Sequence, residues 1–146
     1  MDVNINYTKL RYNAVEPTCG SLCSAGYDLS AAIDEPVMIP PHCTVKIGTG
    51  LSVELPNGTF GGIYARSGIA TKEGLRPANC TGVIDSDYRG EIIVALHNDS
   101  DTHRIVEPSE RIAQLIVQPY IRAKYNEVGA LSDTERGAGG FGSTGK

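Results

Sequence analysis

The stretch VKIGTGLSVEL, residues 45–55, indicates the kind of fold that this chain adopts. Val45 and Ile47 stand two residues apart, and from Leu51 onward apolar residues again alternate with polar ones. A period of two is typical of β-strands that bury one face and expose the other. The stretch therefore predicts half-buried strand structure.

Similar short runs follow one another along most of the chain. Apart from 45–55, apolar or alternating runs span residues 4–10, 37–39, 62–64, 91–97, 111–119 and 121–128. The 17 glycines and 8 prolines separate these runs at short intervals, as turn residues do. One stretch, 67–73, favours a single helical turn. Many short strands with frequent turns predict an all-β fold, which is a sandwich, jelly roll or barrel.

Composition restricts the class of function. The chain has 146 residues and a net charge of -4, which argues against a nucleic-acid-coating protein but leaves room for an anionic small ligand held by local arginines. No apolar run approaches the roughly 20 residues of a membrane span. The first ten residues lack the basic and apolar regions of a signal peptide. We therefore expect a soluble, cytoplasmic protein with no nucleic-acid or membrane partner.

The four cysteines do not make a complete metal motif. Cys19 and Cys23 form a C-x3-C pair that could open a zinc site, but no second close cysteine pair follows. The three histidines also lack the spacing of zinc ligands. We expect isolated reduced thiols.

The end of the chain differs in composition from the rest. Residues 132–146 contain one large apolar side chain, Phe141, among glycines and polar residues, and we treat them as a flexible arm on a single domain of residues 1–131. Residues 140–146 fit most of a phosphate-binding loop, but no helix follows them to complete it. Two interpretations remain: an unordered tail, or a lid in which Phe141 stacks on a base and Arg136 binds phosphate.

Three further stretches contain residue types that carry chemistry. Residues 65–68, Ala-Arg-Ser-Gly, place a guanidinium and a hydroxyl at an expected helix start, although an ordinary capped turn would look the same. Residues 82–90, GVIDSDYRG, predict a hairpin whose aspartates can be turn formers alone. Asp28 is a single carboxylate at the start of an expected strand.

Taken together, these stretches carry a resemblance. With residues 110–116 (ERIAQLI) and 136–145 (RGAGGFGSTG), they are similar in order and spacing to the five motifs of the homotrimeric dUTP pyrophosphatases, the dUTPases. Minor departures are Glu110, where that family often has Asp, and Cys80-Thr81 within the hairpin. The resemblance implies a distorted jelly-roll or barrel. It also implies hydrolysis of dUTP to dUMP and pyrophosphate, by attack of water at the α-phosphorus, which supplies dUMP for dTMP synthesis and keeps uracil out of DNA.

The resemblance also implies a role for each matching residue. Asp85 would be the base that activates water, and Tyr88 would exclude a ribose 2′-OH. The uracil edge would be bound by Asn79 and by the backbone of Gly82, Val83 and Ile84. The phosphates would be bound by Arg66, Ser67, Gly68 and Gln114, and Asp28 would contact a hydrated Mg2+ that the phosphates mainly hold. Arg136, Phe141, Gly142 and Ser143 would close over the nucleotide.

Assembly and alternatives follow from the same resemblance. It implies a homotrimer in which one chain supplies the phosphate motifs, a second the hairpin and a third the arm. Two rivals remain: a dCTP deaminase or bifunctional enzyme of the same fold, and a non-catalytic trimer that binds nucleotide for regulation. The intact hairpin and arm favour the dUTPase interpretation.

Overall fold

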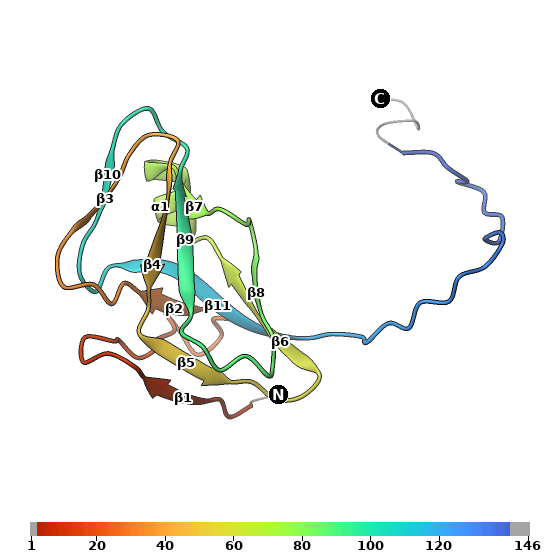
Figure 1. Ribbon diagram of the computed structural model, residues 1–146, viewed down its shortest axis with the longest axis horizontal. Coiled ribbons are helices and arrows are strands. Elements are labelled where there is room, and N and C mark those ends of the chain that lie inside the picture. The colour runs from red at the N-terminus through yellow and green to blue at the C-terminus, as the bar shows by residue number, and fades with distance from the viewer. Residues whose placement is uncertain (1–2, 141–146) are drawn as a thin grey trace.

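The computed structural model describes residues 3–140. In that range it contains eleven strands and one helix, α1 (Ser67–Glu73), which Figure 1 labels. The strands are β1 (Asn6–Lys9), β2 (Tyr27–Ser30), β3 (Val37–Ile39), β4 (Thr44–Gly48), β5 (Leu51–Glu54), β6 (Thr59–Tyr64), β7 (Leu75–Pro77), β8 (Gly82–Ile84), β9 (Ile93–Asn98), β10 (Arg104–Val106) and β11 (Arg111–Pro119). The prediction of an all-β fold with one short helical segment is confirmed.

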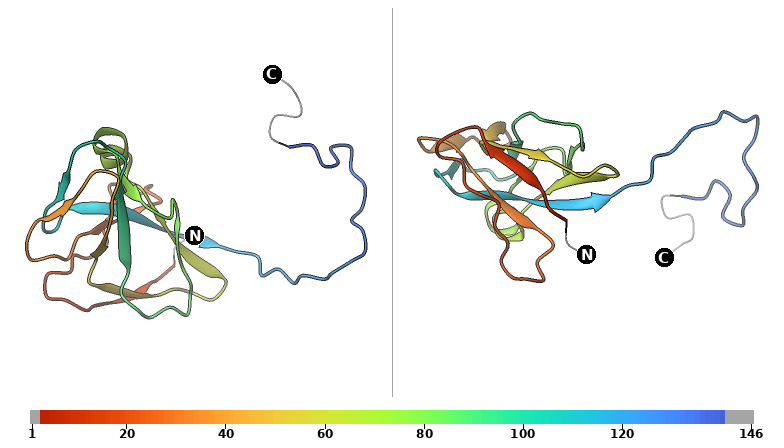
Figure 2. Two further views of the ribbon diagram at one scale, coloured as in Figure 1. Left: turned by 45° about the horizontal axis from the view of Figure 1, so that its top comes forward. Right: turned by 90° about the horizontal axis from the view of Figure 1, so that it is seen from below.

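The strands form two larger antiparallel sheets and two strand pairs. One sheet has the order β2-β11-β6-β8 and the other β4-β9-β7, while β1 pairs with β5 and β10 with β3. Neighbours such as β2 and β11 are far apart in sequence, as is usual in jelly rolls. Within the described residues the sheets do not join into a closed barrel. The fold is therefore jelly-roll-like, and the two views of Figure 2 show its sheets packed around one core.

The stretch 45–55 forms two strands, as its alternation predicts, but only β4 is half-buried. In β5 Ser52 is buried as well, and its Oγ donates to the Arg89 carbonyl over 2.8 Å. Ile47 in β4 and Leu51 and Val53 in β5 are buried in the core, while the polar residues of β4 face outward. Each such side chain contributes about 1.5–3 kcal/mol by leaving water. Gly50 between the strands has φ of 67°, and a side chain there would overlap the Cβ of Ala14, so only glycine fits.

Helix α1 follows Arg66, as expected. Ile69 is its buried residue, and the chain leaves the helix through Gly74, whose φ of 71° is the left-handed conformation common after helix ends. At seven residues α1 is too short to cross a bilayer, and the structure contains no membrane-spanning helix in residues 3–140.

The predicted hairpin at 82–96 is wrong in its pairing. β8 pairs with β6, whereas β9 pairs with β4 and β7. The chain runs beside β9 as far as Ala78, whose N–H donates to the Ala95 carbonyl over 2.7 Å, and then crosses to the other sheet. The two arms of the expected hairpin are therefore splayed, with a gap between them.

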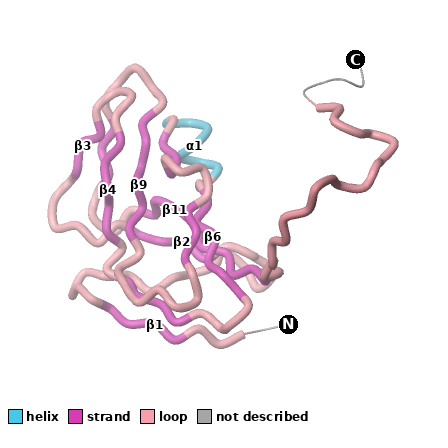
Figure 3. The backbone as a smooth tube through the Cα atoms, turned by 45° about the vertical axis from the view of Figure 1, so that its right-hand side comes forward, coloured by secondary structure: helices cyan, strands magenta, loops and turns pink. Residues whose placement is uncertain are grey.

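The predicted strand at 121–128 does not form either. After β11 ends at Pro119 the chain leaves the body and stays extended, as Figures 1 and 3 show. Ile121 and Tyr125 are each 95% exposed. A strand needs a neighbour for its backbone groups, and no strand among residues 3–140 pairs with this segment.

Candidate active site

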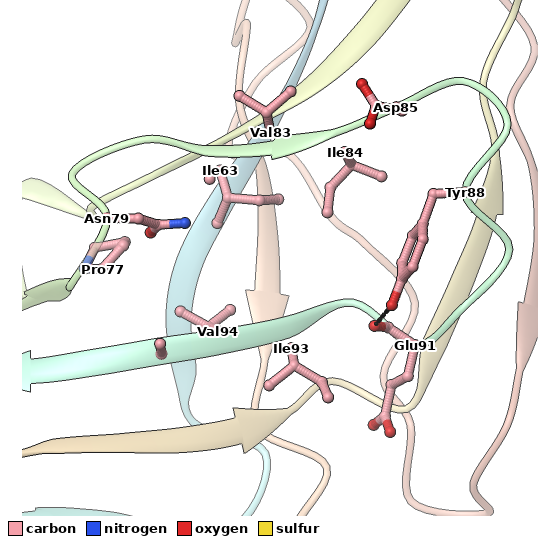
Figure 4. Close-up of a pocket in the computed structure, with 12 residues that line it drawn as sticks. Ile63, Pro77, Asn79, Val83, Ile84, Asp85, Tyr88, Glu91, Ile93 and Val94 are labelled. Carbon is pink, nitrogen blue, oxygen red and sulfur yellow. Dashed lines mark hydrogen bonds between the residues drawn. The ribbon is translucent and has the colours of Figure 1, made fainter.

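A pocket of about 280 Å³ lies where β8 and β9 separate. Figure 4 shows β8 and the loop after it on one side of the pocket and the start of β9 on the other. Its lining residues are Ile63, Pro77, Asn79, Gly82, Val83, Ile84, Asp85, Tyr88, Glu91, Ile93, Val94 and Ala95. All six predicted residues of the 79–88 region therefore line one concavity.

The wall formed by β8 has unused backbone groups. β8 is the edge strand of its sheet and pairs only with β6 among the described residues, so its other edge faces away from that ladder. An added Cβ at Gly82 would lie 3.1 Å from the Cβ of Ile63, a tight contact, so the glycine lets β8 pack closely on β6. Asn79 projects its amide into the space at the end where the chain changes sheets (Figure 4).

The other end of the pocket is set by the turn between Asp85 and Tyr88. The Tyr88 N–H donates to the Asp85 carbonyl over 3.1 Å, and the Tyr88 hydroxyl donates to the Glu91 carbonyl over 3.0 Å, which fixes the ring. The Asp85 side chain is exposed and has no hydrogen bond or ion pair within residues 3–140. It is thus a free carboxylate at the rim of the pocket.

A second group of predicted residues gathers at the ends of β2, β6 and β11. Asp28 accepts from Arg66 Nε at 2.7 Å, and its second oxygen accepts from Arg111 Nη1 at 3.0 Å. Gln114 lies between Asp28 and Tyr64 in the strand register. Its Nε2 donates to the Ala65 carbonyl over 2.9 Å. The predicted phosphate residues and Asp28 are therefore brought together.

Ser67 and Gly68 belong to the same group, because they follow Arg66 directly at the start of α1 and are exposed. Two guanidinium groups against one carboxylate leave this group with a net positive charge, which favours an anion. Among the described residues no cluster of three or more His, Cys, Asp or Glu side chains could hold a metal ion.

Sequence reasoning missed two residues of these sites. Arg111 pairs with Asp28, but the two are 83 positions apart, and the only signal was its place beside Glu110 in a recognised motif. Glu91 lines the pocket, and its carboxylate accepts from the Gly50 N–H at 2.8 Å and from Arg11 at 3.0 Å. Nothing in the sequence pattern pointed to that anchoring role.

The two groups lie apart within one chain. Ile84 stands opposite Gly61 near the start of β6, whereas Arg66 follows the end of that strand. Five residues of extended chain separate Gly61 from Arg66, which corresponds to roughly 15 Å. The free carboxylate of Asp85 and the Arg66 group of the same chain therefore occupy different ends of β6.

The expected arm is described only in part. Arg136 is exposed, and its Nε donates to the Gly139 carbonyl over 2.9 Å, within its own turn. Phe141, Gly142 and Ser143 lie outside the described residues. The left view of Figure 2 places the segment that leads to them away from the body.

Comparisons with known proteins identify the family of the chain. A dUTPase family model matches residues 13–145. A deoxyuridine 5'-triphosphate nucleotidohydrolase of Desulfitobacterium hafniense is 48% identical over 123 residues, which are 84% of this chain and 82% of that protein. The enzyme of that name from Nautilia profundicola is 46% identical over 144 residues, 99% of this chain and 100% of its own.

Solved structures give the same result. The dUTPase of Staphylococcus bacteriophage 80alpha with dUpNHpp superposes with a TM-score of 0.89 at 29% identity, and the match covers 98% of this chain and 99% of that one. On the extent of the family match and the identity to these relatives, the chain belongs to the dUTPase family.

Proposed function

We propose that the protein hydrolyses dUTP to dUMP and pyrophosphate by attack of water at the α-phosphorus. Its relatives are dUTP nucleotidohydrolases, and family membership supports the same activity here. The observation that carries the proposal is the pocket between β8 and β9, which brings an open backbone edge, a free carboxylate and a fixed tyrosine together. The product dUMP would feed dTMP synthesis, and removal of dUTP would keep uracil out of DNA.

Uracil recognition follows from the open edge of β8. Uracil presents an acceptor, a donor and an acceptor along one edge, and the backbone of Gly82, Val83 and Ile84 with the Asn79 amide can pair with them. Cytosine presents a donor where uracil has an acceptor, so it would leave buried groups unpaired.

The sugar and the reacting water belong to the other end of the pocket. The ring of Tyr88, whose hydroxyl is held by the Glu91 carbonyl, would pack on the deoxyribose and leave no room for a 2′-OH. The unpaired Asp85 carboxylate would orient the water and accept its proton, as a general base within hydrogen-bond distance does.

The triphosphate suits the positive group around Arg66. Arg66, Ser67, Gly68 and Gln114 would hold the phosphate oxygens, with Arg111 adding a guanidinium that the sequence did not suggest. Asp28 is the carboxylate of this group and fits a contact to a hydrated Mg2+ carried by the phosphates. Bound Mg2+ would neutralise charge on the phosphate oxygens.

We infer that the active unit is a homotrimer with shared sites. Asp85 and Arg66 of one chain lie at opposite ends of β6, so the pocket of one subunit and the phosphate group of another would have to meet around one dUTP. The extended segment after Pro119 exposes Ile121, Tyr125 and Leu131, which is the behaviour expected of a segment that packs on another subunit. A symmetric assembly of identical chains provides both the meeting of these groups around dUTP and a surface for the exposed segment.

The arm completes the proposed site. Arg136, with Phe141, Gly142 and Ser143, would close over bound dUTP, and residues 132–146 would remain the separate arm of a domain that spans 1–131. Closure would exclude water other than the one held by Asp85. The deaminase and binding-only alternatives gain no support from any feature of the pocket.

One assay tests the proposal directly. Pyrophosphate release from dUTP is measured beside dCTP, dTTP and UTP, each with and without Mg2+. We expect release from dUTP only, and much faster release with Mg2+. Release of ammonia from dCTP, or binding of dUTP without turnover, would contradict it in favour of one of the alternatives.

A further inference from the structure

The turn that carries Asn79 into the pocket has an unfavourable backbone conformation. Cys80 has φ of 61°, in the left-handed region that residues other than Gly, Asn and Asp rarely adopt. The turn is closed by the Cys80 N–H, which donates to the Pro77 carbonyl over 3.1 Å. The Thr81 N–H donates to the Asn79 carbonyl over 2.6 Å. Such a conformation persists only where its surroundings hold it.

One side chain contacts both ends of this turn. Nη1 of Arg76 donates to the same Pro77 carbonyl oxygen over 3.3 Å and lies 4.0 Å from Sγ of Cys80. Arg76 stands in β7, directly before the point where the chain leaves β9 and crosses to β6. Its guanidinium is therefore placed to hold the crossing in one shape.

Arg76 is itself held by Asp99. Its Nε donates to Asp99 Oδ2 at 2.7 Å and its Nη2 to Oδ1 at 3.0 Å, which is the two-pronged geometry that fixes a guanidinium most firmly. Hydrogen bonding from Arg76 is the main cause that lowers the pKa of Asp99. The Asp99 N–H also donates to the Gly74 carbonyl at the end of α1, over 2.9 Å. Asp99, which holds Arg76, is thus itself bonded to the end of α1.

We propose that Arg76, held by Asp99, is a positioning residue that sets the uracil wall of the pocket. It acts through the Pro77 carbonyl and Cys80 on the direction of the Asn79 amide, and it does not touch the substrate. An exposed ion pair contributes little to stability, so the effect of this pair lies in the geometry of the turn. The proposal rests on the assignment of the pocket to uracil given above.

The test compares Arg76→Met with a matched control, Asp101→Asn. Asp101 lies two residues beyond Asp99 and pairs with His42 at 3.0 Å, but neither residue contacts the turn. We expect Arg76→Met to raise KM for dUTP about tenfold, the size of one poorly aligned hydrogen bond to the base, with kcat within about twofold. Discrimination against dCTP should fall by a similar factor. Asp101→Asn should leave KM, kcat and the discrimination against dCTP unchanged.

A second variant separates positioning from general stability. Glycine adopts positive φ freely, so Cys80→Gly should relieve the strain that Arg76 holds. In the double variant Arg76→Met with Cys80→Gly, KM should be at least about threefold lower than in Arg76→Met alone. Because relief of this strain can also raise stability, thermal unfolding of each variant is measured beside KM, and a change in KM without a matching change in Tm separates positioning from stability. Arg76→Lys, which keeps one donor and the charge, should give an intermediate KM even where Arg76→Met fails to fold.

If the wild-type protein hydrolyses dUTP, three results would overturn the positioning role of Arg76. They are an unchanged KM in both Arg76 variants, a loss confined to kcat, and no recovery in the double variant. A wild-type chain that does not hydrolyse dUTP would overturn the proposed function instead, so the two failures are distinguishable.

Discussion

The pocket wall and the segment after β11 contribute to the same proposed site, yet they obtain their order differently. The wall is fixed inside one chain: Asn79 sits on a clamped turn, and the Tyr88 hydroxyl is held by a carbonyl only three residues away. Residues 121–138 are exposed throughout and form no strand. In the proposed site the wall would be ready to select a base before assembly, whereas the segment would have to find its partner in another subunit or in bound nucleotide.

This difference indicates where the site is preorganised. The groups proposed to recognise uracil are fixed in advance, so binding would not cost their conformational entropy. The arm has too few apolar groups to order itself, so the proposed closure would have to be driven by contacts with the nucleotide. The predictions below separate the two contributions.

The largest expected effect concerns the fixed wall. Asp85→Asn should reduce kcat by roughly 100-fold or more, the usual contribution of a general base, while dUTP still binds. Asp87→Asn is the control, because Asp87 lies in the same exposed turn but does not line the pocket. Steady-state pyrophosphate release measures both. Near-normal turnover of Asp85→Asn would show that Asp85 is not the general base, and Asp87 would be the next candidate for that role.

Truncation should affect the arm without affecting the wall. Deleting residues 136–146 removes Arg136 and Phe141, the proposed stacking partner of the base. Base–aromatic stacking is worth about 1–3 kcal/mol, so turnover should fall roughly 10- to 100-fold. The number of chains in the assembly and the thermal unfolding should stay those of the intact protein. A deletion from residue 120 onward should in addition dissociate the oligomer, which light scattering would detect as a mass close to that of one chain. If both deletions kept full activity, the arm would have no part in the reaction.

Mixing two inactive chains tests whether wall and arm come from different subunits. One chain carries Asp85→Asn, and the other lacks residues 136–146. After co-refolding, random assembly gives an intact wall and an intact arm to about a quarter of the sites in a symmetric oligomer. Activity should therefore recover to about that fraction. A mixture no more active than its parents would indicate that each chain completes its own site.

Tyr88→Ala tests a single part of the wall. Removing the ring opens space beside the sugar, so turnover of UTP relative to dUTP should rise about tenfold while dCTP stays excluded by the backbone. Tyr88→Phe keeps the ring and loses only the hydrogen bond to Glu91, so its selectivity should stay close to that of the wild type. Continued exclusion of UTP by Tyr88→Ala would place ribose discrimination elsewhere.

A contrast between local and long-range order also explains what the sequence could predict. The alternation in residues 45–55 predicted β4 and β5, because a period of two depends only on neighbours in sequence. The pairing of β8 with β6 was missed, because a local pattern cannot say which distant strand lies alongside. Arg111 was missed for the same reason, since its partner Asp28 is 83 positions away. The strand expected at 121–128 needs a neighbour that the chain itself does not supply.

The smallest expected effect is on the arm without any mutation. Amide exchange in residues 132–140 should slow when a non-hydrolysable dUTP analogue and Mg2+ are added, because phosphate contacts from Arg136 give the segment partners that it lacks alone. Amides of the wall, such as that of Tyr88, already have acceptors and should change less. Phe141→Trp adds an optical signal, which should change with dUTP and return as dUMP accumulates. Equal exchange with and without the analogue would mean that the segment stays unordered and that the wall alone accounts for binding.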